Sequence, residues 1–338
     1  MPHVLIAGRI HDDGVAVFAR DPNYTFQMVD EVSTESYVPK LPQADALLIR
    51  TQPLPGWAIA TAPRLRIVSR HGVGFDAIDV PALDVRGIPL AVVGDVNSRP
   101  VAEHTLALML ALAKRVALHD AATRDGRWAL RNSFSATELH GKRLFLVGFG
   151  RIGRLVAGMA SAFGMRVSAY DPFQTPDAIA SAGAEPVVDL LDGLAAAHVV
   201  SLHVPKAGDR PLIGVSELRA MRRGALLVNT ARGGLVDEDA LADALVDGRI
   251  GGAGLDVFVD EPPRPSNRLL ACPQAILSPH LAGLTEECAA RMGEVAARNI
   301  VDFFDGRLDS RLVVNQPLGD AREAEVRRPI DNEQGPSA

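Results

Sequence analysis

Three residues in the second half of the chain each follow an apolar run that predicts a buried strand: Arg232, Glu261 and His280. An arginine offers a planar fork of N–H donors that binds a carboxylate and polarises a neighbouring carbonyl. A histidine exchanges a proton near neutral pH, and a glutamate bonded to the imidazole fixes its tautomer and favours its protonated form. Because ligands of open parallel sheets bind beyond the carboxyl ends of strands, we expect the three side chains on one edge of a crevice.

Each of these residues also has a simpler interpretation. Arg232 lies beside two glycines and could be a cation on a surface turn. Glu261 precedes a proline and could be a solvated loop acid, and His280 could be a loop histidine whose hydrogen bonds are satisfied. Their combined occurrence at strand ends favours the chemical interpretation.

A glycine pattern in the middle of the chain predicts a dinucleotide site. An apolar run at 144–147 leads into Gly148, Gly150 and Gly153, and a helical pattern covers 152–163. Gly148 permits the tight turn out of the strand, Gly150 lets the backbone approach a pyrophosphate, and Gly153 lets the helix pack closely on the sheet. The alternative is a tight strand–helix turn without a ligand.

The residues around this turn favour NAD as the dinucleotide. The N–H groups near Arg151 and Ile152 face a phosphate at the positive end of the helix dipole. A second strand at 166–170 ends at Asp171, whose carboxylate would accept hydrogen bonds from the ribose of NAD and repel the 2′-phosphate of NADP. Together with the three strand-end residues, the pattern predicts hydride transfer between a nicotinamide and a 2-keto or 2-hydroxy acid.

Composition excludes several other classes of protein. A chain of 338 residues with 47% hydrophobic residues predicts two globular domains, and a net charge of −6 disfavours nucleic-acid binding. Cys272 and Cys288 form neither a metal-binding spacing nor a disulfide framework, so we expect no metal and a reducing compartment. The apolar run within the first ten residues is too short for a signal peptide. The uncharged apolar run at 105–113 is far shorter than the ~20 residues that a membrane helix needs. We therefore expect a cytoplasmic protein without membrane contact.

The N-terminal third is also predicted to be α/β with parallel strands. Its glycine turn at 72–74 lacks a third glycine, so no dinucleotide is assigned to it. The free N–H groups of that turn could form an anion site, and His71 beside it could contact substrate or pack at a domain interface. We expect His104 to be structural.

The longest helical pattern runs over 100–118, and its apolar residues lie nearly all round, which predicts a helix buried between two bodies. We place the first crossing between domains there. The following segment, 120–138, has no clean period. Its Trp128 and Phe134 could pack on a partner subunit or locally.

Eight stretches of the sequence resemble the D-isomer-specific 2-hydroxyacid dehydrogenase family. They occur in the family's order and spacing over most of residues 65–300. The stretches are HGVGFDAID (71–79), NSRPVAEHTLALML (97–110), GKRLFLVGFGRIGR (141–154), FGMRVSAYDP (163–172), VVSLHVP (199–205), LLVNTARGGLVDEDAL (226–241), GAGLDVFVDEPP (252–263) and SPHLAG (278–283).

The resemblance implies two doubly wound parallel-sheet domains, one inserted into the other. A discontinuous flavodoxin-like substrate domain is expected at 1–98 plus 285–315, and a Rossmann NAD-binding domain at 99–284, with crossings near Arg99 and Thr285. We expect residues 316–338 to be a loosely ordered tail, without the regulatory domain appended to some phosphoglycerate dehydrogenases. Family members are typically homodimers that pair through the nucleotide domain, which favours the 127–134 stretch as a partner surface.

The resemblance also assigns roles to individual residues. His280 would be the proton donor in reduction, Glu261 its partner, and Arg232 the carboxylate anchor, with the N–H groups of Val73 and Gly74 also holding the substrate carboxylate. Asp256 would hold the carboxamide of NAD. The further NAD contacts would be Arg151, Ile152, Asp171, Val204, Pro205, Thr230 and Ala231. The stretch 206–211 lacks the family's usual Thr-Pro-Glu-Thr, which puts one adenosine-side contact in doubt.

Several functions remain open within and beyond this family. The substrate could be phosphorylated, as in a phosphoglycerate-type dehydrogenase, or be hydroxypyruvate or glyoxylate. Glu261 and the SPHLAG stretch argue against a formate dehydrogenase. From another class, an NAD(H)-sensing binding protein, like the corepressors built on this fold, could keep the same three residues.

Overall fold

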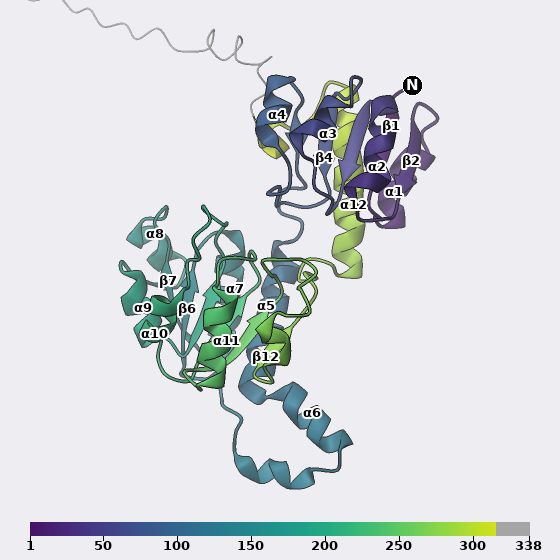
Figure 1. The fold of residues 1–338 in the computed structure, drawn as a ribbon. Coiled ribbons are helices and arrows are strands. Elements are labelled where there is room, and N and C mark those ends of the chain that lie inside the picture. Colours follow the sequence, from purple (N-terminus) through teal and green to yellow (C-terminus); the bar gives the residue numbers. More distant parts are fainter. Residues whose placement is uncertain (316–338) are drawn as a thin grey trace, which may run out of the picture. The chain divides into compact units, whose positions relative to one another are not determined.

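The computed structural model describes residues 1–315, so the tail expected at 316–338 lies outside the described residues. The chain divides into two compact units. Unit 1 consists of Met1–Asn97 and the chain from Glu286 onward, and unit 2 is Ser98–Thr285. The second unit is therefore an insertion in the sequence of the first (Figure 1).

Unit 1 is built on a five-stranded sheet with every strand parallel and the order β2-β1-β3-β4-β5. This is the flavodoxin-like strand order. Its strands are β1 (His3–Ala7), β2 (Thr25–Val29), β3 (Ala46–Ile49), β4 (Ile67–Arg70) and β5 (Leu90–Ala91), and its helices are α1 (Asp12–Ala19), α2 (Thr34–Tyr37), α3 (Gly56–Ala60), α4 (Val80–Val85) and α12 (Glu286–Phe304).

Helices cover both faces of the unit 1 sheet, because its central strands β1, β3 and β4 are apolar and buried on both sides. On one face α1 and α12 pack over a core that includes Phe18 and Ile300. The two helices approach through glycines: a Cβ added to Gly14 would lie 2.6 Å from the carbonyl carbon of Gly293. On the other face α2, α3 and α4 cover a second core that includes Tyr37. Helix α12 is thus an integral layer of unit 1.

Unit 2 is built on a seven-stranded parallel sheet in the order β12-β11-β10-β9-β6-β7-β8. The strands are β6 (Arg143–Val147), β7 (Arg166–Tyr170), β8 (Glu185–Pro186), β9 (Val199–Leu202), β10 (Ala225–Asn229), β11 (Ile250–Leu255) and β12 (Ala275–Leu277). The helices are α5 (Ser98–Lys114), α6 (Val116–Arg124), α7 (Arg151–Ala162), α8 (Pro176–Ser181), α9 (Leu190–Ala196), α10 (Val215–Ala220) and α11 (Glu238–Val246). The strand order reverses between β6 and β9, which makes that pair the switch point of a doubly wound sheet.

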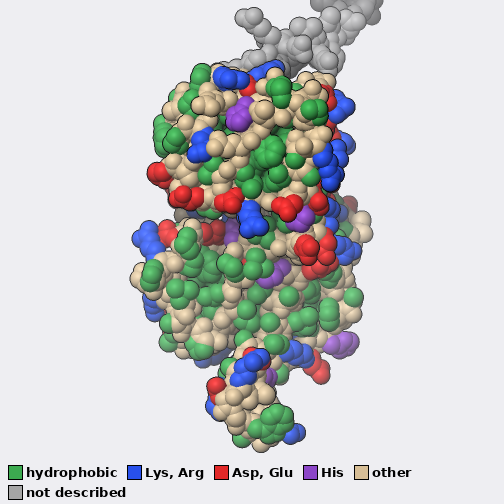
Figure 2. All heavy atoms as spheres, turned by 90° about the vertical axis from the view of Figure 1, so that its right-hand side faces the viewer, with side chains coloured by type: hydrophobic (Ala, Val, Ile, Leu, Met, Phe, Trp, Pro, Cys, Tyr) green, Lys and Arg blue, Asp and Glu red, His purple; other side chains and the backbone are tan. Residues whose placement is uncertain are grey.

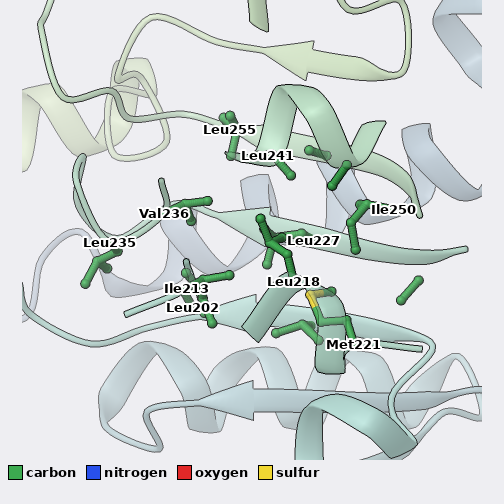
Figure 3. Close-up of a cluster of buried hydrophobic side chains, with 14 of the residues drawn as sticks. Leu202, Ile213, Leu218, Met221, Leu227, Leu235, Val236, Leu241, Ile250 and Leu255 are labelled. Carbon is green, nitrogen blue, oxygen red and sulfur yellow. The ribbon is translucent and has the colours of Figure 1, made fainter. Parts of the chain in front are cut away.

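Two apolar cores cover the faces of this sheet. Leucines of α10 and α11 meet side chains of β9, β10 and β11 in one core, which Figure 3 shows in close-up. Helices α5 and α7 pack over the opposite face. The predicted class, two parallel-sheet α/β domains, is confirmed.

The prediction of one continuous helix over 100–118 is wrong at its C-terminal end. Helix α5 ends at Lys114, and Arg115 takes a left-handed conformation with φ of 51°, after which α6 begins at Val116. The segment without a clean period begins inside α6 and continues through a 3-10 helix at Trp128–Ser133. No helix among residues 1–315 is long and apolar enough to cross a membrane.

Candidate active site

A short polar contact joins two of the predicted catalytic residues, Glu261 and His280. The imidazole Nδ1 of His280 lies 2.6 Å from Oε2 of Glu261. Glu261 lies in the loop after β11, and His280 lies in the loop after β12. Because β11 and β12 are paired in parallel, with Leu255 opposite Leu277, their loops leave the sheet at the same edge. The topology therefore brings together two residues that are 19 positions apart.

The loop that carries Arg232 follows β10 and lies against the loop that carries Glu261. A Cβ added to Gly233 would lie 1.7 Å from the carbonyl oxygen of Phe258, so only glycine fits there. Asn229 donates its side-chain N–H to the carbonyl of Arg232 at 2.9 Å, which fixes the loop from the other side. The Arg232 side chain, half-buried, donates through Nη1 to the carbonyl of Ala231 at 2.7 Å.

The electrostatics of this edge favour an ionised Glu261. Burial raises the pKa of Glu261, but the hydrogen bonds from His280 and from the N–H of Phe258, with the charge of Arg232, outweigh it and hold that pKa below its usual value. An ionised carboxylate only accepts hydrogen bonds, so the contact requires a proton on Nδ1 of His280. The other ring nitrogen, Nε2, is then the atom that can exchange a proton with a ligand.

The backbone of the His280 loop is held by Asp256. His280 has φ of 50°, and its N–H donates to the carbonyl of Asp256 at 2.8 Å. The Asp256 carboxylate, fully buried, accepts the N–H groups of Leu281 at 3.0 Å and Ala282 at 2.9 Å. The predicted carboxamide contact of Asp256 stays a prediction.

The glycine turn between β6 and α7 has the shape that a dinucleotide requires. A Cβ on Gly148, at φ of +97°, would lie 2.5 Å from the carbonyl oxygen of His203, and one on Gly153 would lie 2.4 Å from the carbonyl oxygen of Gly148. A Cβ on Gly150, by contrast, would meet no atom within 4 Å. The first and third glycines therefore serve close packing, and the second keeps space open at the start of α7. Arg151 and Ile152 form the first turn of that helix.

Asp171 directly follows β7 and is tied to the glycine turn. Its Oδ2 accepts the N–H of Phe149 at 2.8 Å, and its Oδ1 accepts the N–H of Phe173 at 2.9 Å. The carboxylate is therefore fixed in place beside the turn, and each oxygen keeps capacity for a further donor. This arrangement, with the open space at Gly150, fits an adenosine dinucleotide.

The remaining predicted NAD contacts lie at the ends of β9 and β10. Val204 and Pro205 follow β9, on the far side of the switch point from Gly148. After β10, the hydroxyl of Thr230 pairs with that of Thr105 on α5 at 2.8 Å, and the N–H of Ala231 donates to Asn229 at 3.0 Å. All of these positions belong to unit 2.

His71, Val73 and Gly74 belong to unit 1, in the turn after β4. The guanidinium of Arg70 holds this turn, because it donates to the carbonyls of Gly74 at 2.9 Å and His71 at 3.2 Å. His71 is 5% exposed, and neither ring nitrogen has a hydrogen-bond partner among the described residues. Burial, with the charges of Arg50 and Arg70, lowers the pKa of His71 to about 4.

Sequence reasoning missed two side chains that support this site. Glu238, at the start of α11, accepts the N–H of Val259 at 2.7 Å and a side-chain N–H of Asn267 at 2.6 Å, which ties down the loop of Glu261. Ser278 donates to Asp256 at 2.5 Å. An acid at a helix start normally indicates capping, so the sequence carried no signal for Glu238. Within residues 1–315, no cluster of three or more His, Cys, Asp or Glu could hold a metal ion.

The sheet order of unit 2, the glycine turn at its switch point and the acid after β7 define the class of Rossmann dinucleotide-binding proteins. The family model "D-isomer specific 2-hydroxyacid dehydrogenase, NAD binding domain" matches residues 106–282. With the relatives described next, this match shows that the chain belongs to the D-isomer specific 2-hydroxyacid dehydrogenase family, and residues 106–282 match the family's NAD-binding domain.

Named relatives agree with this family. A D-3-phosphoglycerate dehydrogenase of Mycobacterium tuberculosis is 41% identical over 302 residues, which cover 89% of this chain and 56% of that protein. The chain thus spans little more than half the length of that relative. A glyoxylate reductase of Aeropyrum pernix is 37% identical over 323 residues, which cover 92% of this chain and 96% of the relative. The structure of a D-lactate dehydrogenase from Aquifex aeolicus, complexed with NAD and lactic acid, has a TM-score of 0.84 and 28% identity, covering 93% of this chain and 99% of that one.

Proposed function

We propose that this protein is an NAD-dependent dehydrogenase that acts at C2 of a small D-2-hydroxy acid or the corresponding 2-keto acid. The observation that carries the proposal is the 2.6 Å contact between His280 Nδ1 and Glu261 Oε2, at the sheet edge that also carries Arg232. The names of the relatives, a D-3-phosphoglycerate dehydrogenase and a glyoxylate reductase, support the same class of substrate.

His280 is the proton-exchanging group of this proposal. Glu261 accepts the hydrogen bond from Nδ1–H, so Nε2 donates a proton to the C2 oxygen when a keto acid is reduced and accepts it when a hydroxy acid is oxidised. The hydrogen bond to the ionised Glu261 also fixes the orientation of the imidazole, so that Nε2 is the ring nitrogen left for the substrate. When bound, NAD supplies the hydride acceptor, or as NADH the hydride donor, for C2.

Arg232 is the carboxylate anchor. Its guanidinium binds the substrate carboxylate through two N–H groups, and this cation compensates for a net charge of −6 that opposes anion binding. We assign the N–H groups of Val73 and Gly74 to the same carboxylate and His71 to the substrate-binding turn. The hydrogen bonds from Arg70 that hold this turn support the assignment.

The NAD-binding residues of this proposal are the glycine turn, the start of α7 and the strand-end residues described above. Asp171 selects NAD over NADP, because a 2′-phosphate would bring negative charge against a carboxylate held in place by two N–H groups. Cys272 and Cys288 are buried and are not joined in a disulfide, which supports a reducing compartment, the cytoplasm.

We further propose a homodimer that forms through the NAD-binding unit. Trp128 is 67% exposed and Phe134 is 90% exposed. Both lie in the segment from α6 to β6, which projects from unit 2 in Figure 1, and Figure 2 shows hydrophobic side chains on this projection at the foot of the view. Large aromatic side chains exposed together are typical of a protein–protein contact.

A panel of 2-keto acids followed by the absorbance of NADH tests the proposed function. Glyoxylate, hydroxypyruvate, pyruvate and 3-phosphohydroxypyruvate distinguish unphosphorylated from phosphorylated substrates. Turnover of any of them supports the enzyme. Tight NADH binding without turnover of any would instead indicate an NAD(H)-sensing protein on the same fold.

A further inference from the structure

A chain of polar side chains leads from α5 to the loop that carries His280. On α5, Nε2 of His104 lies 2.9 Å from the hydroxyl of Ser278. That hydroxyl lies 2.5 Å from Oδ1 of Asp256, and His104 Nε2 itself is 3.6 Å from the same oxygen. His104 and Ser278 are 174 positions apart, so the contact exists only in the folded unit.

The direction of the hydrogen bonds in this chain follows from the donors available. An aspartate carboxylate only accepts, so the single hydroxyl proton of Ser278 goes to Asp256. The Ser278 oxygen then accepts from His104, whose Nε2 must carry a proton. His104 is therefore the donor that begins the chain.

Asp256 connects this chain of hydrogen bonds to the backbone of His280 and of the two residues that follow it. Its carboxylate accepts the N–H groups of Leu281 and Ala282, and its carbonyl accepts the N–H of His280. His280 has φ of 50°, a left-handed conformation that side chains other than glycine rarely adopt. Such a conformation persists only where the surroundings enforce it. The bonds to Asp256, with a second bond from the His280 N–H to the carbonyl of Ser278 at 3.0 Å, hold the loop in this conformation.

We propose that His104 is a positioning residue: acting through Ser278 and Asp256, it fixes the 278–282 loop and thereby the place of the His280 imidazole. The inference rests on the proposed function, in which His280 exchanges the proton. His104 acts on the reaction only through this chain.

Three variants and one control test the positioning role by kinetics. His104→Ala and Ser278→Ala each interrupt the chain, and we expect kcat to fall on the order of 10-fold in each. His104→Gln keeps an N–H donor at the end of its side chain and should recover most of the lost kcat. His198→Ala is the control, because His198 pairs with the N–H of Arg143 at the opposite end of the sheet and should leave kcat unchanged.

Coupling and spectroscopy complete the test. Because the two side chains act in series, the His104→Ala/Ser278→Ala double variant should lose no more than the worse single variant. The imidazole NMR signals of His280 should shift in His104→Ala and return in His104→Gln. The NMR measurement needs no turnover, so it decides the inference even if no 2-keto acid is reduced and the proposed function fails. Unchanged His280 signals in His104→Ala, additive losses in the double variant, or equal losses for Ala and Gln at position 104 would overturn the proposal.

Discussion

Gly233 and Phe258 are in direct backbone contact: a Cβ on Gly233 would lie 1.7 Å from the Phe258 carbonyl oxygen. The contact joins the loop that carries Arg232 to the loop that carries Glu261. The spacing between Arg232 and the Glu261–His280 pair therefore depends on the absence of a side chain at position 233.

Gly233→Ala should displace the two loops from each other. We expect a loss of about 1–3 kcal/mol in the free energy of unfolding, as for other overpacked positions, and a fall in kcat on the order of 100-fold through misplacement of Arg232. Gly158→Ala on α7 is the matched control, because a Cβ there meets no atom within 4 Å and helical alanine is favoured over glycine. Chemical denaturation and steady-state kinetics of both variants check the prediction; a Gly233→Ala protein with wild-type stability would contradict the contact.

Asp171→Ala should relax the selection of NAD over NADP. The substitution removes the carboxylate that would repel a 2′-phosphate, so the ratio of kcat/KM for NADH to that for NADPH should fall by roughly 10-fold or more. Asp177→Ala, an exposed acid at the start of α8, controls for the change in net charge. An unchanged ratio in Asp171→Ala would exclude the ribose role.

The buried His71 should make the protein sensitive to acid. Because its pKa is lowered from 6.5 to about 4, the folded state binds fewer protons than the unfolded state between these values. The stability that neutral His71 contributes is therefore complete above pH 6.5 and is lost as the pH falls toward 4, by at most roughly 3 kcal/mol.

Denaturant unfolding of His71→Gln and wild type from pH 7.5 to 4.5 measures this loss. The variant should show a shallower decline in the free energy of unfolding, and His140→Gln, at an exposed position, should follow the wild type. Parallel curves for His71→Gln and wild type would show that His71 binds protons equally in the folded and unfolded states.

Exposed aromatic side chains should control the oligomeric state. The Trp128→Ser/Phe134→Ser double variant should sediment as a monomer under conditions where the wild type is a dimer, because it removes the apolar surface of the projecting segment. Trp57→Ser, at a tryptophan 60% exposed in unit 1, is the control and should leave the dimer intact. A dimeric double variant would place the partner surface elsewhere.

Elements with clear apolar patterns and clear stops could be predicted from the sequence. Strand β7 at Arg166–Tyr170 has the expected bounds. The break at Arg115 could not be predicted, because neither glycine nor proline marks it and its left-handed conformation is set by the fold. Strand β5, at the edge of the unit 1 sheet, spans Leu90–Ala91. Edge strands of this kind depend on pairing that a pattern does not record.

The candidate site also has a part that the sequence indicated and a part that it did not. The residue types and their places after strands indicated Glu261 and His280, and the pairing of β11 with β12 explains why they meet. The partners of Asp256 were not foreseeable, because His104 and Ser278 have no pattern that marks them as neighbours. Hydrogen bonds between side chains of distant segments arise from the packing of the fold, and only a structure shows them.

Transfer of deuterium from NADH is the most direct test of the proposed hydride transfer to C2. A 2-keto acid accepted by the enzyme is reduced with NADH that carries deuterium at both C4 positions, and the product is resolved by chiral chromatography and mass spectrometry. Hydride transfer to C2 with His280 as the proton donor predicts a D-2-hydroxy acid with one deuterium at C2, formed roughly 10²–10⁴-fold more slowly by His280→Ala. An L-hydroxy acid, a product without deuterium at C2, or an unchanged rate in His280→Ala would contradict it.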